Sequence, residues 1–211
     1  MGRPPASEAK LDEIISAALR LFWRCGIRAT TVRRIAVEAG VTSGALYRHF
    51  SSKAGLAEAL FESCAQRLTD SLRLARGLSQ GPREELASLT ATLLEFSQRE
   101  PAAYGFLMER HHDDIGRLTP ARELPKDLFE AAVKAGTGAG CFPAQDAGLT
   151  TALVIGMCLR AVFFFDRGMV SSSWEELVRR VVSAALLVAG EAPPRKERGH
   201  HGPGCAPDSP H

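Results

Sequence analysis

The sequence has few of the features that mark secreted, metal-binding or redox proteins. Its five cysteines are an odd number, and no two of them have CxxC spacing, so neither a disulfide framework nor a zinc knuckle is expected. Residues 1–10 are polar and lack the apolar stretch of a signal peptide. We therefore expect a cytoplasmic protein whose thiols are reduced.

Long hydrophobic runs are also missing. The most apolar segment spans residues 149–165, which is 17 residues. A helix that crosses a bilayer needs roughly 20 apolar residues. The segment also contains Thr150, Thr151 and Arg160. We interpret it as part of a buried helix that is apolar on almost every side, and we expect no membrane partner.

Motifs of enzymes and cofactor-binding proteins are not found. There is no GxSxG, HExxH or P-loop pattern, and the glycine-rich run 136–140 follows an expected helix where a dinucleotide loop would follow a strand. Residues 111–114 are metal-ligand types, but adjacent side chains point apart, so we expect no metal and no cofactor. An enzyme built on an all-helical core remains an alternative that turnover assays would reveal.

Charge is distributed unevenly, although the net charge is only +2. Residues 1–53 carry nine Lys or Arg and four Asp or Glu, which gives +5. The remaining residues carry seventeen and twenty, which gives −3. A basic N-terminal part suits a module that faces phosphates.

The sequence does contain a succession of helix signals. Apolar residues recur with the 3.6-residue period, Pro82 and Pro101 suit first turns, and Ser173 to Glu176 forms a capping box. No convincing strand pattern is present. The pattern predicts an all-α fold of about nine helices, among them residues 8–25, 53–76, 125–135 and 144–167, with a polar connection over 111–124.

The most specific pattern is the run from Thr30 to Lys53. Thr31 can cap one helix, Gly40 supplies the positive φ that ends it, and Thr42 or Ser43 can cap the next. The run therefore predicts a helix, a tight turn, a second helix and the start of a third. The outward residues are hydroxyls, small residues and cations without a carboxylate, which suits a DNA groove: Arg33, Ser43, Gly44, Ala45, Tyr47, Arg48, His49 and Lys53.

This run resembles the DNA-binding domain of the TetR family of one-component transcriptional regulators. The shared pattern is two threonines, Ile-Ala, Ala-Gly-Val, Leu-Tyr-x-His-Phe and a lysine a few residues later, within residues 7–60. The resemblance implies an N-terminal arm and a three-helix helix-turn-helix domain over residues 1–52. It also implies a larger helical effector-binding and dimerisation domain over 53–191. Residues 192–211 are rich in Pro, Gly and charge, so we expect a disordered tail.

For DNA recognition, the resemblance implies that the helix beginning near Ser43 enters the major groove. Its first residues would lie against base edges, Arg48 would hold part of the specificity, and Arg3 would reach the minor groove. The DNA-binding set is then Arg3, Thr31, Arg33, Thr42, Ser43, Gly44, Ala45, Tyr47, Arg48, His49 and Lys53.

The helices after residue 82 would supply the other two sites. The expected effector pocket is lined by Phe96, Tyr104, Phe106, Met108, Phe129, Met157, Arg160 and Phe164. Arg160, a cation on an apolar helix, would pair with Glu95 or Asp166, or bind an acidic effector. The expected dimer interface contains Leu153, Val162, Val178, Val181, Val182 and Ala185.

These expectations combine into one functional prediction. The protein would be a homodimeric repressor that binds a palindromic operator in double-stranded DNA and is released by a small, largely apolar effector. A helical interaction adaptor and a constitutive DNA-binding regulator without effector control are the alternatives. The sequence alone does not separate a repressor from an activator.

Overall fold

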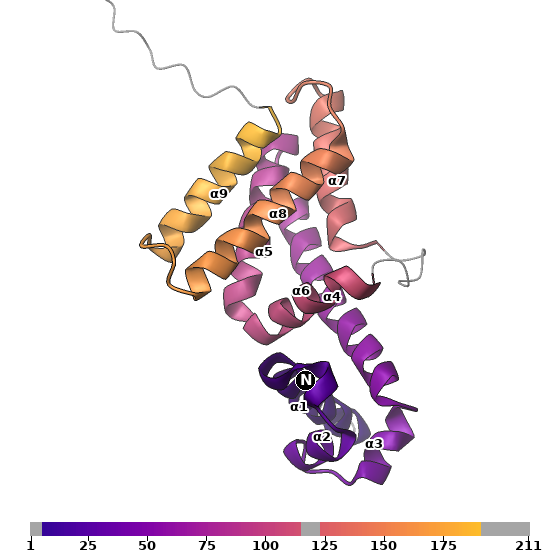
Figure 1. Cartoon of the computed structure of the whole chain (residues 1–211). Coiled ribbons are helices and arrows are strands. Elements are labelled where there is room, and N and C mark those ends of the chain that lie inside the picture. The colour runs from indigo at the N-terminus through magenta and orange to yellow at the C-terminus, as the bar shows by residue number, and fades with distance from the viewer. Residues whose placement is uncertain (1–5, 115–122, 191–211) are drawn as a thin grey trace, which may run out of the picture.

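The computed structural model describes residues 6–114 and 123–190, and within these ranges it contains nine helices and no strand (Figure 1). This confirms the all-α prediction. The helices are α1 (Ala6–Ala29), α2 (Val32–Glu38), α3 (Ser43–His49), α4 (Lys53–Leu78), α5 (Pro82–Arg99), α6 (Pro101–Asp114), α7 (Pro125–Gly138), α8 (Ala147–Asp166) and α9 (Trp174–Val188).

The helix boundaries follow the predicted signals in the N-terminal part. The Thr31 hydroxyl accepts a hydrogen bond from the Arg34 amide at 3.2 Å, and the Thr42 hydroxyl accepts one from Ala45 at 3.1 Å. Gly40 has a φ of 65°, which lets the chain turn between α2 and α3. Local chemistry therefore fixes the helix-turn-helix geometry.

Two boundaries differ from the expectation. Gly26 leaves helical geometry with φ 76° and ψ 157°, as predicted, but the chain resumes one more turn before Ala29. Residues 111–114, which were expected in a polar connection, continue α6 to Asp114. The predictions for Arg3 and for the tail over 192–211 lie outside the described residues.

The helices form two groups, with α1 to α3 at one end and α4 leading from them to α5 to α9 (Figure 1). Helix α5 lies at the centre of the larger group and contacts α4, α6, α7, α8 and α9. Its residues Leu89, Leu94 and Phe96 are fully buried. A second junction joins the groups, because α1 also packs against α6.

Helix α8 was expected to be covered on every side, but within a single chain only its inner face is buried. Its inner face is buried at Val154, Cys158 and Val162, but Leu149 and Leu153 on the outer face are 59% and 50% exposed. Among the described residues, α8 is the one helix with the length and hydropathy that a membrane span requires. Core helices of soluble proteins meet the same two criteria.

The close packing at the end of α7 yields the first prediction. A Cβ added to Gly136 would lie 2.2 Å from Cδ2 of the buried Phe142 ring. We expect Gly136→Ala to lower the free energy of unfolding by about 1–3 kcal/mol, the usual cost of overpacking, as measured by urea denaturation.

Gly138→Ala is the matched control, because it changes the same helix where no atom lies within 4 Å of the added Cβ. It should leave stability unchanged or raise it by up to about 1 kcal/mol. An unchanged unfolding midpoint for Gly136→Ala would show that the Phe142 ring moves aside freely.

Candidate functional site

The exposed surface of α2 and α3 is held in shape by a small apolar core. Ile35, Ala36 and Leu46 are almost fully buried, so the opposite sides of both helices face outward. Glu38 of α2 accepts contacts from Arg20 and Arg24 of α1 at 3.4 and 3.3 Å. The carboxylate at the end of α2 is therefore already occupied by cations of α1.

The predicted DNA-contact residues lie on this exposed surface. Arg33, Tyr47, Arg48 and His49 are exposed, and Ser43 and Ala45 are partly exposed. Gly44 is exposed, and a Cβ placed on it would meet only the Thr42 hydroxyl at 4.0 Å. The start of α3 thus offers small residues and open space for a close approach, with cations and a tyrosine on its later turn.

Lys53 has a structural role that its sequence context did not indicate. Its ammonium donates to the backbone carbonyls of Ile27 at 2.8 Å and Thr30 at 2.9 Å, with Arg28 at 3.4 Å. It therefore holds the end of α1 against the start of α4. No residue pattern marks such a long-range contact, and the contact of Lys53 with DNA phosphate remains a prediction.

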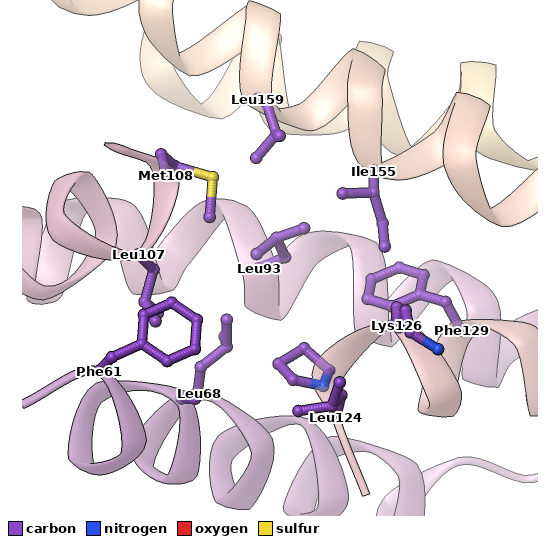
Figure 2. Close-up of a pocket in the computed structure, with 12 residues that line it drawn as sticks. Phe61, Leu68, Leu93, Leu107, Met108, Leu124, Lys126, Phe129, Ile155 and Leu159 are labelled. Atoms are coloured by element: carbon purple, nitrogen blue, oxygen red, sulfur yellow. The ribbon is translucent and has the colours of Figure 1, made fainter. Parts of the chain in front are cut away.

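An apolar pocket lies between α4, α5, α6, α7 and α8 (Figure 2). Its cavity volume is about 90 Å³, and its lining is almost entirely carbon, with Lys126 at one side. The lining residues are Phe61, Ala65, Leu68, Leu93, Leu107, Met108, Leu124, Pro125, Lys126, Phe129, Ile155 and Leu159.

This lining revises the predicted effector set. Met108 and Phe129 line the pocket as expected. Phe96 and Phe106 are fully buried core residues, and Tyr104, Met157, Arg160 and Phe164 are not among the lining side chains. The residues missed were aliphatic, such as Leu93 and Ile155. Their helical spacing is that of ordinary core residues, so no sequence signal separates the two roles.

The carboxylate partner expected for Arg160 is not found among the described residues, and its contact with an acidic effector stays untested. Its guanidinium lies over the rings of Phe163 at 4.6 Å and Phe164 at 5.2 Å, on the exposed face of α8. Phe163 and Phe164 follow Arg160 by three and four positions, so the helix brings the three side chains to one side. The aromatic faces, and not a carboxylate, are the partners that this cation has in the structure.

The predicted dimer-interface set divides into three groups. Val162 and Ala185 are 1% and 0% exposed within a single chain, so they cannot contact a second copy in this conformation. Val178 and Val181 are partly buried and pack against the core. Leu153 is half exposed, and Val182 is partly exposed. The outer face of α8 also carries Leu149, Phe163 and Phe164, which the prediction for the interface did not include.

One turn of α6 connects the pocket with the helix-turn-helix part. Leu107 and Met108 line the pocket. The two preceding residues contact α1, because the Phe106 ring stacks on Phe22 with centroids 5.8 Å apart. The Trp23 ring lies directly on the Gly105 backbone, where an added Cβ would overlap it. The pocket wall and the contact with α1 therefore share one turn of α6.

The fold and this surface define the chain as a helix-turn-helix DNA-binding regulator. A model of bacterial regulatory proteins of the tetR family matches residues 14–60. The transcriptional repressor KstR2 of Rhodococcus jostii (strain RHA1) is 32% identical over 151 residues, which are 65% of this chain and 74% of that protein. The chain belongs to the TetR family and is a transcriptional regulator.

Two further known proteins resemble this chain. TtgR of Pseudomonas putida is 51% identical over 51 residues, or 24% of each chain. The crystal structure of a tetR-family regulatory protein from Rhodococcus RHA1 superposes with a TM-score of 0.75 at 21% identity, covering 87% of this chain and 98% of that one. The larger helical group therefore has the same fold as its counterpart in that protein.

The Lys53 contacts yield the second prediction. Lys53→Met removes the donor from three carbonyls at the end of α1, and we expect the free energy of unfolding to fall by about 1–3 kcal/mol in thermal denaturation. Tyr47→Ala, at a residue that is 52% exposed, should change stability by less than about 0.5 kcal/mol while weakening DNA binding. Unchanged stability with reduced DNA affinity for Lys53→Met would assign this lysine to phosphate contact instead.

Proposed function

We propose that this regulator is a homodimeric repressor that binds a palindromic operator and is released by a small, largely apolar molecule. The observation that carries the proposal is the turn of α6 from Gly105 to Met108, which touches both the apolar pocket and α1.

The exposed face of α3 supports the proposal that the protein binds an operator. Ser43, Gly44 and Ala45 are small and would permit close approach to base edges, and the exposed Tyr47 and His49 would contact phosphates. Substitutions at Ser43, Ala45 or Arg48 should change which sequence is preferred. Two such surfaces in a dimer would read half-sites about one helical turn or somewhat more apart, with binding that weakens steeply as salt rises.

The outer face of α8 supports the proposal that the protein is a dimer. Leu149, Leu153, Phe163 and Phe164 are exposed on it, and Leu187 on the neighbouring α9 is 53% exposed. Helices α8 and α9 pack against one another and lie side by side (Figure 1). An apolar face of this extent is typical of an interface, and a second copy would cover it.

The third prediction tests the dimer. We expect the wild-type protein to sediment as a dimer at micromolar concentration and Leu153→Asp to sediment as a monomer, because the interface would then bury an unpaired charge. The monomer should lose operator binding, since one half-site contributes too little. Leu74→Asp, a similarly exposed leucine on α4, is the control and should remain dimeric. A monomeric wild-type protein would contradict the proposal.

The size of the pocket supports effector control through movement. Ligand pockets usually have volumes of roughly 300–1,000 Å³, whereas this cavity has about 90 Å³. An effector therefore has to enlarge the cavity by displacing the surrounding helices. A ligand that binds only the enlarged conformation shifts the population toward it. FadR of Bacillus subtilis, solved in complex with stearoyl-CoA, has a related fold (TM-score 0.66, 16% identity, 83% of this chain and 97% of that one).

The fourth prediction tests the coupling through α6. Gly105→Ala places a methyl group on the Trp23 ring and should push α1 away from α6 without any effector. We expect operator affinity to fall by roughly 5–150-fold, the usual scale of allosteric coupling, in fluorescence anisotropy on an operator found by binding-site selection.

Gly156→Ala on α8 is the control, because no atom lies within 4 Å of the added Cβ. It should bind operator like the wild type, and circular dichroism should show both variants folded. A folded Gly105→Ala variant with wild-type affinity would mean either that the Trp23 ring, which is 48% exposed, turns into solvent or that the α1 contact does not control DNA binding. If no apolar compound changes operator affinity either, the constitutive regulator is the better description.

A further inference from the structure

The phenol of Tyr104 is a buried polar group without a protein partner. The side chain is only 7% exposed, and its hydroxyl has no hydrogen-bond partner among the described residues. A buried hydroxyl left unpaired costs about as much as a lost hydrogen bond. Native proteins rarely leave such a group unexplained, so it requires a partner.

The hydroxyl of Thr151 is also buried and unpaired, but the two cases differ. A threonine on a helix can turn its hydroxyl to the carbonyl four residues earlier, as Thr69 does to Ala65 and Thr90 does to Leu86. The phenol oxygen of Tyr104 stands at the far end of a rigid ring and cannot reach its own backbone. Its partner has to come from elsewhere.

Tyr104 is placed beside the apolar pocket by its position on α6. Leu107 and Met108, three and four residues later, line the pocket, so Tyr104 lies on the same face of the helix one turn away. The Phe106 ring points to α1 instead, where it stacks on Phe22. Enlargement of the cavity along α6 toward the N-terminal end of this helix would therefore approach Tyr104.

The groups around this hydroxyl define its chemistry. Burial, with Cys158 and Asp166 of α8 nearby, raises the pKa of Tyr104, so the phenol remains a protonated donor. Burial also raises the pKa of the Cys158 thiol to about 12, which keeps that neighbour neutral. The carboxylate of Asp166 disfavours an anion beside the Tyr104 hydroxyl. The surroundings thus suit a neutral oxygen acceptor.

We propose that Tyr104 determines effector specificity by donating a hydrogen bond to a neutral carbonyl or hydroxyl oxygen on an otherwise apolar molecule. The effector class is then a hydrophobic ketone, aldehyde or alcohol, and a pure hydrocarbon is disfavoured. This assignment rests on the proposed function of the pocket as the effector site.

The test uses two probes of nearly equal shape, acetophenone and isopropylbenzene, which differ in a carbonyl oxygen. Dissociation constants for both are measured by calorimetry or NMR titration on the wild type and on Tyr104→Phe. We expect the substitution to weaken the binding of acetophenone by roughly 2–13-fold, which corresponds to one net hydrogen bond. The affinity for isopropylbenzene should be unchanged. Tyr47→Phe, the other tyrosine, should change neither.

A second measurement keeps the test independent of probe affinity. Removal of an unpaired buried hydroxyl should leave the melting temperature of Tyr104→Phe equal to or above that of the wild type. A lower melting temperature would show that the hydroxyl is already satisfied, for example by a buried water, and would overturn the assignment.

The titrations also separate the hypothesis that the pocket binds a ligand from the hypothesis that Tyr104 selects the oxygen of that ligand. If both probes bind the wild type and Tyr104→Phe changes their affinities equally, the pocket is a ligand site but Tyr104 does not select the oxygen. If neither probe binds the wild type at concentrations up to its solubility limit, the ligand function of the pocket is contradicted. The assignment of Tyr104 then fails with it.

Discussion

The stacked rings of Phe22 and Phe106 join the two helical groups at a point where neither group can change alone. Both rings are fully buried, and Trp23 lies on the adjacent Gly105 backbone without space for a side chain. Close-packed interiors do not deform continuously, so a displaced α6 has either to carry α1 with it or to break the contact. Placement of the DNA-binding surface therefore depends on the position of α6.

Polar contacts also hold the helix-turn-helix unit together. Lys53 binds the carbonyls at the end of α1, and Arg20 and Arg24 bind Glu38 of α2. These contacts hold α1, α2 and the start of α4 as one unit. A shift of α1 then moves the whole reading surface of α3, and the internal geometry of the helix-turn-helix is preserved.

The residues differ in how far their roles could be predicted from sequence. Thr31, Gly40 and Thr42 act through bonds to near neighbours, so their spacing was sufficient to predict the turn. The pocket could not be predicted in the same way. Phe96 and Met108 look alike in a periodic pattern, yet one is core and the other is pocket wall. That difference depends on how the helices meet. Lys53 and Gly105 have partners more than 20 residues away, which no local pattern encodes.

Helix α8 has two different sides. Its inner side contributes Ile155 and Leu159 to the pocket, and its outer side presents Leu149, Leu153 and two phenylalanines to the surroundings. A second copy that covered the outer side would fix α8 in place. An effector could then enlarge the cavity only toward the helices that are not held at the interface. Among the pocket walls, α4 and α6 both contact α1, so dimerisation would direct the strain of ligand binding through these two helices toward the DNA-binding unit.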